Sequence, residues 1–213
     1  MTYSIKRAVA QRMPSRCLLW LNGQPQLKHV LRRAYVQASK PGDLQEVELR
    51  KGPAKGCRLV LDMGTDEQRI CDGTYEPWVH DVLPRVLHPG GVLWDVGAHV
   101  GYYCIVGSLL STATHLAIEP GPSTDRLQRN LALNGITNVD LLSAAVGSQV
   151  GTARFDFNDN SIFNRISEGG DHEVNVLTLD SLLDDRDPPS VIMMDIEGGE
   201  RRPGPRRDPR QRR

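Results

Sequence analysis

The sequence predicts an α/β fold with a doubly wound, mostly parallel β-sheet. Three short apolar runs have the length and composition of buried parallel strands, and they lie at 92–96, 114–119 and 190–197. Segments with helical spacing follow the first two runs, so strand and helix alternate along the chain. This alternation is typical of a sheet whose helices cross from one strand to the next.

The first quarter of the chain has no sustained hydrophobic period, and residues 1–56 are predicted to form a variable segment with one or two helices around 26–37. A strand is predicted at 57–64, where an aliphatic run ends at a glycine. A helix then begins at Pro77, because proline suits the first helical position. Its apolar residues at helical spacing are Trp78, Val79, Val82 and Val86. Pro84 is expected to bend this helix.

Elements of both kinds are predicted in the second half of the chain. They are helices at 102–110 and 123–135, a strand at 139–147, and exposed or edge strands at 151–157 and 174–179. The helix at 123–135 has a hydroxyl cap in Ser123 or Thr124 and Gly135 beyond its end.

Composition and charge indicate one globular domain, or one domain with an appendage, and a basic end. The chain has 213 residues, 39% of them hydrophobic, and a formal net charge of zero. Of the 26 basic and 26 acidic residues, 19 and 25 respectively lie before position 201, so the body is mildly acidic. We therefore predict a domain at 57–200 and a basic, disordered tail at 201–213.

Cysteines and apolar runs predict a cytoplasmic protein. The four cysteines contain no C-x-x-C pair, so neither a zinc site nor a disulfide framework is indicated, and no metal is predicted. The longest apolar run near the N-terminus, "CLLWL", is too short for a signal peptide or a membrane span. We expect no membrane association.

The glycine-rich segment "DVGAHVG" joins the predicted strand at 92–96 to the helix that follows it. Gly97 allows a sharp turn, Ala98 leaves room for a ligand, and Gly101 lets helix and strand approach closely. A dinucleotide fingerprint has a further glycine between these two, and Asp95 would repel a phosphate. A nicotinamide dehydrogenase is therefore disfavoured.

Two strand-end carboxylates suggest a different ligand. Asp95 suits an ammonium or sulfonium cation, and Glu119 lies 22 positions beyond Gly97, close to the spacing at which a carboxylate binds ribose hydroxyls. S-adenosylmethionine combines an adenosine, a positive centre and an amino-acid tail. It therefore fits both carboxylates.

Several linked segments resemble the FkbM-type methyltransferases, which are class I enzymes that use S-adenosylmethionine. The segments are "GTYEPW", "GGVLWDVGAHVGYYC", "AIEPGP", "RNLALNGITNVDLLSAAVG", "TLDSLL" and "MDIEGGE". The resemblance covers roughly residues 57–200. It implies a Rossmann-like fold and methyl transfer, typically to a hydroxyl oxygen of a small metabolite or sugar.

The resemblance also implies roles for individual residues. Those on the methionine side of the cofactor are Asp95, Gly97, Ala98, His99 and Gly101. Glu119 is expected to bind the ribose, Ala144 to lie near the adenine, and Glu76 to cap the site from the preceding helix. A backbone role is expected for His99.

The segment "MDIEGGE" supplies the candidate catalytic carboxylates, Asp195 and Glu197, with Glu200 a further candidate. We expect only one of Asp195 and Glu197 to face the acceptor, and we favour Asp195. A role of Asp195 in anchoring the following turn is an equal alternative. The family usually has a lysine where Met193 stands here, so a cationic role at that position is lost.

The end of the sequence departs from the family, which continues with an amphipathic helix and further strands. Three prolines and seven arginines in the last thirteen residues do not suit such a helix. We expect a truncated or frameshifted end and a sheet that lacks its C-terminal helix and strands. An inactive remnant that at most binds the nucleoside is therefore the alternative to an active methyltransferase.

The expected partner is a small-molecule acceptor. Nucleic-acid binding by the basic tail is not expected, because no aromatic residues are interleaved with the arginines for base stacking. The sequence carries no signal for an oligomeric state.

Overall fold

The computed structural model describes residues 42–156, 165–166 and 170–196. The chain divides into two compact units, residues 1–40 and 41–213, and every described residue belongs to the second unit. The helices expected around 26–37 and the predicted tail at 201–213 lie outside the described residues. In the part of the chain that is described, no helix has the length and apolar character needed to cross a membrane.

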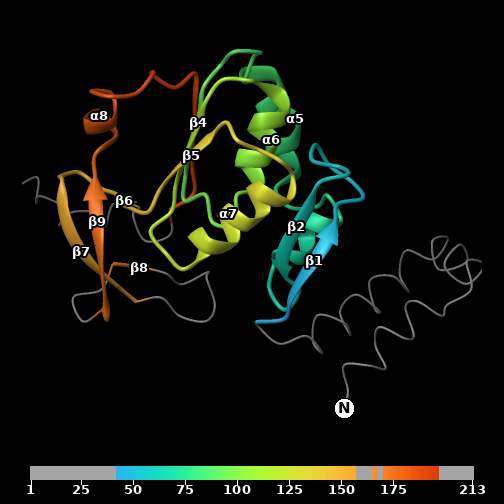
Figure 1. Ribbon diagram of the computed structural model, residues 1–213, viewed down its shortest axis with the longest axis horizontal. Helices are drawn as coiled ribbons and strands as arrows, with labels where there is room; N and C mark the ends of the chain where they lie inside the picture. The colour runs from blue at the N-terminus through green and yellow to red at the C-terminus, as the bar shows by residue number, and fades with distance from the viewer. Residues whose placement is uncertain (1–41, 157–164, 167–169, 197–213) are drawn as a thin grey trace, which may run out of the picture. The chain divides into compact units, whose positions relative to one another are not determined.

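The centre of the fold is a four-stranded parallel sheet with the strand order β10-β3-β4-β5. Figure 1 labels β4 and β5 of this sheet. Its strands are β3 (Leu93–Val96), β4 (His115–Ile118), β5 (Val139–Leu142) and β10 (Val191–Met194). Helix α6 (Tyr102–Leu110) connects β3 to β4, and helix α7 (Ser123–Leu133) connects β4 to β5. The chain then returns to place β10 on the other side of β3. This reversal of strand order is where ligands bind in open α/β sheets.

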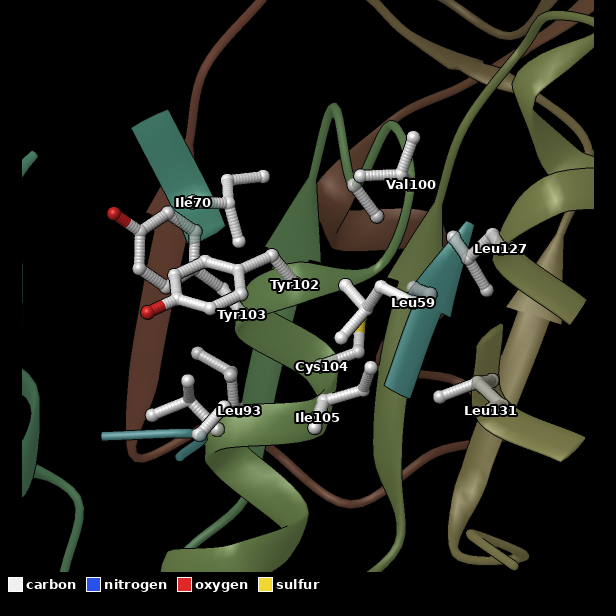
Figure 2. Packing of buried hydrophobic residues seen from close by; sticks show 14 of the residues in the cluster. Leu59, Ile70, Leu93, Val100, Tyr102, Tyr103, Cys104, Ile105, Leu127 and Leu131 are labelled. Atoms are coloured by element: carbon white, nitrogen blue, oxygen red, sulfur yellow. The ribbon is translucent and has the colours of Figure 1, made fainter. Parts of the chain in front are cut away.

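Both faces of the central strands are covered, as their continuous apolar sequences predict. On one face, Leu93 and Ala117 pack in a cluster with residues of α5 (Pro77–Val86), α6 and α7. Figure 2 shows part of this cluster, in which side chains from β2, β3, α6 and α7 meet. On the other face, Trp94 and Leu116 pack with Leu182 of α8 (Leu179–Leu182). The predicted α/β class with a parallel, Rossmann-like sheet is confirmed.

β1 (Leu44–Glu48) and β2 (Arg58–Asp62) form a hairpin that packs on α7. Two asparagines hold it there: Asn130, within the helix, and Asn134, its C-cap. The backbone N–H of Val60 donates to the side-chain oxygen of Asn130 at 2.7 Å, and the Asn130 amide donates to the carbonyl of Val100 at 2.9 Å. One turn later, Asn134 both accepts from and donates to the backbone of Arg58. The amides therefore satisfy an edge of β2 that no strand in the described part of the chain pairs. Segment α4 (Gln68–Cys71) follows β2.

The predicted strand at 139–147 is in fact two strands in different sheets. β5 belongs to the parallel sheet, whereas β6 (Ala145–Val146) belongs to a second sheet with the order β6-β9-β7-β8. The other strands of this sheet are β7 (Gly151–Asp156), β8 (Arg165–Ile166) and β9 (His172–Leu177). β7 and β9 pair in antiparallel fashion at the two places where exposed or edge strands were predicted. The break between β5 and β6 leaves Ala144 free to line a pocket.

Two local predictions differ from the structure. In α5, Val79 and Leu83 face the core, whereas Trp78 is 64% exposed. Positions 79 and 83 are one helical turn apart, and position 78 is rotated away from them. The predicted hydroxyl cap of α7 is absent: Thr124 donates to the carbonyl of Gly121, and no side chain caps the helix.

Candidate active site

A pocket of about 200 Å³ opens at the carboxyl ends of β3, β4 and β10. The predicted site residues that line it are Asp95, Gly97, Ala98, His99, Glu119, Ala144 and Asp195. They come from four separate segments of the chain, which the strand order brings together. Two predicted residues, Glu76 and Gly101, do not line this pocket, and Glu197 lies outside the described residues.

The turn after β3 has the backbone conformation that its glycines allow. Gly97 and Gly101 have φ of +85° and +78°, in the region that favours glycine. A Cβ atom at Gly97 would collide with the backbone carbonyl of Asp195, so this glycine allows the end of β10 to come close. A Cβ atom at Gly101 would lie 2.8 Å from the Cγ of Leu127, so this glycine allows α7 to pack against the turn.

Asp95 is almost completely buried, with 4% of its surface exposed. The pKa of its carboxyl is raised to about 7, mainly by burial; a hydrogen bond opposes the rise, and the neighbouring charges of Glu119 and Asp195 add to it. That bond is donated by the thiol of Cys104, whose Sγ lies 3.1 Å from Oδ2. A buried carboxyl with a raised pKa in a pocket is typical of a binding or catalytic site. A cation bound beside it would favour the charged form.

Glu119 is the second buried carboxylate of the pocket, and its orientation is fixed by the glycine turn. The backbone N–H of His99 donates to its Oε2 at 2.9 Å. Burial raises the pKa of Glu119, whereas hydrogen bonds from the backbones of His99 and Gly121 and the charge of Arg126 lower it. Because β3 and β4 are adjacent and parallel, Asp95 and Glu119 lie at the same edge of the sheet.

Glu76 is linked to the pocket through a tyrosine. The hydroxyl of Tyr103 donates to Glu76 Oε2 at 2.9 Å, and the ring of Tyr103 lines the pocket. Tyr75 and Tyr102 line the pocket as well, and the ring centroids of Tyr102 and Tyr103 are 5.0 Å apart. Glu76 therefore contacts the lining of the pocket through the hydroxyl of Tyr103.

Asp195 follows β10 directly and has an exposed side chain. Its backbone N–H donates to the carbonyl of Val96 at 2.9 Å, which continues the pairing of β10 with β3 by one residue. The expectation that only one of Asp195 and Glu197 faces the acceptor does not follow from strand geometry, because residues two positions apart share a face. Asp195 lines the pocket.

A polar group that the sequence reasoning missed lies beside His99. Glu67 is buried and lines the pocket, and its Oε2 accepts from Arg126 Nη1 at 2.9 Å. The side chain of His99 lies close to both, and burial lowers its pKa although Glu67 opposes this. Glu67 comes soon after the strand that ends at Asp62, so a search for strand-end carboxylates beyond β3 and β4 could have found it.

The charges that line the pocket have one sign. Asp66, Glu67, Asp95, Glu119 and Asp195 line it, and no lysine or arginine does among the described residues. Such a pocket favours a ligand that carries positive charge.

Comparison with solved structures gives weak, partial likeness to methyltransferases. SMU.1697c of Streptococcus mutans, provisionally assigned as a methyltransferase and solved with SAH, is 21% identical over 32% of this chain and 39% of its own, with a TM-score of 0.31. An rRNA methylase of Streptococcus thermophilus is 22% identical over 32% of this chain and 41% of its own, with a TM-score of 0.30. Trm5b of Pyrococcus abyssi is 20% identical over 46% of this chain and 27% of its own, with a TM-score of 0.35. The chain therefore spans less than half the length of each of these three proteins.

No curated protein matches the sequence significantly. The model of the methyltransferase FkbM domain matches residues 95–202. This match begins at the first strand-end carboxylate and includes Glu119, Ala144 and Asp195. Because it covers half of the sequence, the chain belongs to the FkbM methyltransferase family.

Proposed function

We propose that this protein transfers a methyl group from S-adenosylmethionine to a hydroxyl oxygen of a small molecule. The observation that carries this proposal is the pair of buried carboxylates, Asp95 and Glu119, at the ends of adjacent parallel strands in one pocket. The family supports methyl transfer in general. The hydroxyl acceptor and a cytoplasmic location remain our proposals.

The residues that line the pocket fit this cofactor in their chemistry. Asp95 offers a carboxylate to the ammonium or sulfonium centre, and Glu119 offers one to the ribose hydroxyls. Gly97 and Ala98 present backbone with little side-chain bulk, and their N–H groups donate to the carbonyl of Ile118. Ala144, in the break between β5 and β6, leaves room for the flat face of an adenine.

S-adenosylmethionine supplies, when bound, a methyl group on a positively charged sulfur. Transfer to an alcohol forms a carbon–oxygen bond, breaks the carbon–sulfur bond and releases the hydroxyl proton. Most of the rate gain in such a displacement comes from holding the reacting atoms in line. We assign acceptance of the proton to Asp195, an exposed carboxylate at the pocket where solvent can take the proton on.

A second candidate function is cofactor binding without methyl transfer. Ile192 and Met194 of β10 are 46% and 49% exposed, so this strand, which leads to Asp195, presents apolar side chains to solvent. Among the described residues β10 pairs with β3 alone, and a strand with one neighbour gives Asp195 less support than a covered strand would. The two candidates share cofactor binding and differ in turnover.

Calorimetric titration with S-adenosylhomocysteine tests the shared step. The wild-type protein should bind, and Asp95→Ala and Glu119→Ala should each lose most of the heat. Glu173→Ala is the matched control, because Glu173 is exposed on β9 and does not line the pocket. Unchanged binding in both pocket variants would move the cofactor site elsewhere.

Turnover is tested with labelled S-adenosylmethionine and a pool of extracted metabolites. Transfer of label to an alkali-stable methyl ether supports the proposal. Binding of S-adenosylhomocysteine with no labelled product from any pool would favour the non-catalytic candidate.

A further inference from the structure

His99 is held in a conformation that is uncommon for a residue with a side chain. Its φ is +48°, in the left-handed region, and it lies in the turn between Gly97 and Gly101. Histidine adopts this region more readily than most residues, but the conformation still carries strain and persists only where the surroundings fix it. The contacts of His99 therefore show what fixes it.

The imidazole of His99 lies beside two charged neighbours. Its Nε2 lies 3.2 Å from Oε1 of Glu67 and 3.4 Å from Nη2 of Arg126. Arg126 in turn donates from Nη1 to the other oxygen of Glu67 at 2.9 Å. The ring thus contacts an ion pair whose members come from two different segments, the residues before α4 and the first turn of α7.

Glu67 is itself held rigidly. Only 5% of its side chain is exposed, and its Oε2 also accepts from the backbone N–H of Asp62 at 2.6 Å. Its Oε1 is buried 3.2 Å from Nε2 of His99 but makes no hydrogen bond in the described part of the chain, because an arginine can only donate and Nε2 accepts from Arg126. A carboxylate fixed in this way can hold the ring of His99 in one position through Arg126, which pairs with Glu67 and donates to the ring.

The backbone of the same histidine orients the carboxylate that we assign to the cofactor. The N–H of His99 donates to Oε2 of Glu119 at 2.9 Å, and the residue that carries this donor has the left-handed φ. A continuous set of contacts therefore runs from Glu67 through Arg126, the ring and the backbone of His99 to Glu119.

We propose that Glu67 is a positioning residue for the cofactor: it holds His99 in the left-handed conformation, and His99 thereby orients Glu119 toward the ribose. The proposal rests on the proposed function of the pocket. In this proposal, the segment before α4 controls the affinity for the cofactor without contacting the cofactor directly. Glu67 lines the pocket, so direct contact with the ligand is the competing explanation that the experiment has to separate.

A double-mutant cycle separates these explanations. The dissociation constant of S-adenosylhomocysteine is measured for the wild-type protein, Glu67→Gln, His99→Asn and the double variant. Asparagine favours the left-handed region and has no imidazole for Glu67 to hold. We expect Glu67→Gln to weaken binding about tenfold in the wild-type background, as for loss of a conformational constraint, and less than about twofold beside His99→Asn.

An equal loss in both backgrounds would overturn the proposal, because Glu67 would then act without His99. No loss in the wild-type background would overturn it as well. Asp125→Asn is the matched control, since it removes a negative charge from an exposed position of α7 next to Arg126. If the wild-type protein gives no heat, the proposed function fails and this inference fails with it. If the wild-type protein binds, a failure in the cycle concerns the role of Glu67 alone.

Glu67→Gln disturbs a buried ion pair and could fail to fold, which thermal unfolding of each variant would reveal. In that case the proposal is tested by comparing two substitutions of His99 instead. Valine is β-branched and resists a positive φ, so His99→Val should bind S-adenosylhomocysteine at least about fivefold more weakly than His99→Asn. Equal affinities of these two folded variants would show that the conformation of His99 does not control binding.

Discussion

Ionisation of Asp95 should control how the affinity for the cofactor depends on pH. The pKa of this buried carboxyl is raised to about 7 in the free protein, and its burial is the main cause. A cationic ligand needs the charged form. If only that form binds, the ionised fraction rises from about one tenth near pH 6 to about three quarters near pH 7.5, so affinity should rise roughly eightfold.

The assay is calorimetric titration of S-adenosylhomocysteine across this pH range, where the ammonium group of the ligand keeps its charge. Asp95→Asn should bind more weakly near pH 7.5 and should lose most of the pH dependence. Equal affinity of the wild-type protein near pH 6 and pH 7.5 would refute the reasoning. So would an unchanged slope in Asp95→Asn, because another group would then be responsible.

The raised pKa of Asp95 also makes the stability of the folded protein depend on pH. The dependence is opposite to that of a salt-bridged carboxylate, whose pKa is lowered. The pKa of Asp95 is higher in the folded protein than its ordinary value of 3.8, so the folded state binds more protons between these values. Stability from this group is therefore lost as the pH rises from about 4 to about 7. Asp95→Asn removes this loss, and it should raise the melting temperature of the free protein near pH 7.5, by an amount that corresponds to at most about 4 kcal/mol.

Further predictions concern the turn, the hairpin and proton release. Asn130→Ala should lower the free energy of unfolding by about 3 kcal/mol, because it leaves buried backbone groups without partners, whereas the more exposed Asn134→Ala should lower it by about 1 kcal/mol; urea denaturation measures both. Gly101→Ala combines a positive φ with a close contact to Leu127 and should lose about 1 to 3 kcal/mol in the same assay, and an unchanged midpoint would contradict that account of the turn. Binding of S-adenosylhomocysteine near pH 6.5 should release protons from Asp95, so the measured heat should vary with the ionisation enthalpy of the buffer.

The sequence was sufficient for the central sheet because its strands form continuous apolar runs. The runs at β3, β4 and β10 are apolar with little alternation. Because the strands are parallel, the residues at their carboxyl ends lie at the same edge of the sheet. Asp95 and Glu119 could be placed together for the same reason, since adjacent parallel strands end at one edge. The likeness of these segments to the family added the roles of the residues but not their contacts.

The parts that the sequence did not predict depend on contacts between distant segments. The hairpin rests on α7 through the amides of Asn130 and Asn134, and no local pattern indicates which strand an asparagine will meet. The residues after β5 are as apolar as β5 itself, so the sequence predicts one strand at 139–147. In the structure β5 pairs with β4, whereas the residues of β6 pair with β9. Glu67 and Arg126 belong to segments that are 59 positions apart, so their pairing is visible only in the folded chain.

Burial of Asp95 in the free protein also bears on which ligands the pocket can distinguish. Ionising this carboxyl without a partner is unfavourable near and below pH 7, so a ligand gains from Asp95 only if it brings a positive charge to it. Adenosine has the ribose that we assign to Glu119 but no ammonium or sulfonium group. The pocket should therefore bind adenosine with little dependence on the state of Asp95, and its preference for the complete cofactor should grow as the pH rises through the pKa of that carboxyl. Discrimination between the nucleoside and the cofactor thus follows from the cost of burying one carboxylate, rather than from the shape of the pocket alone.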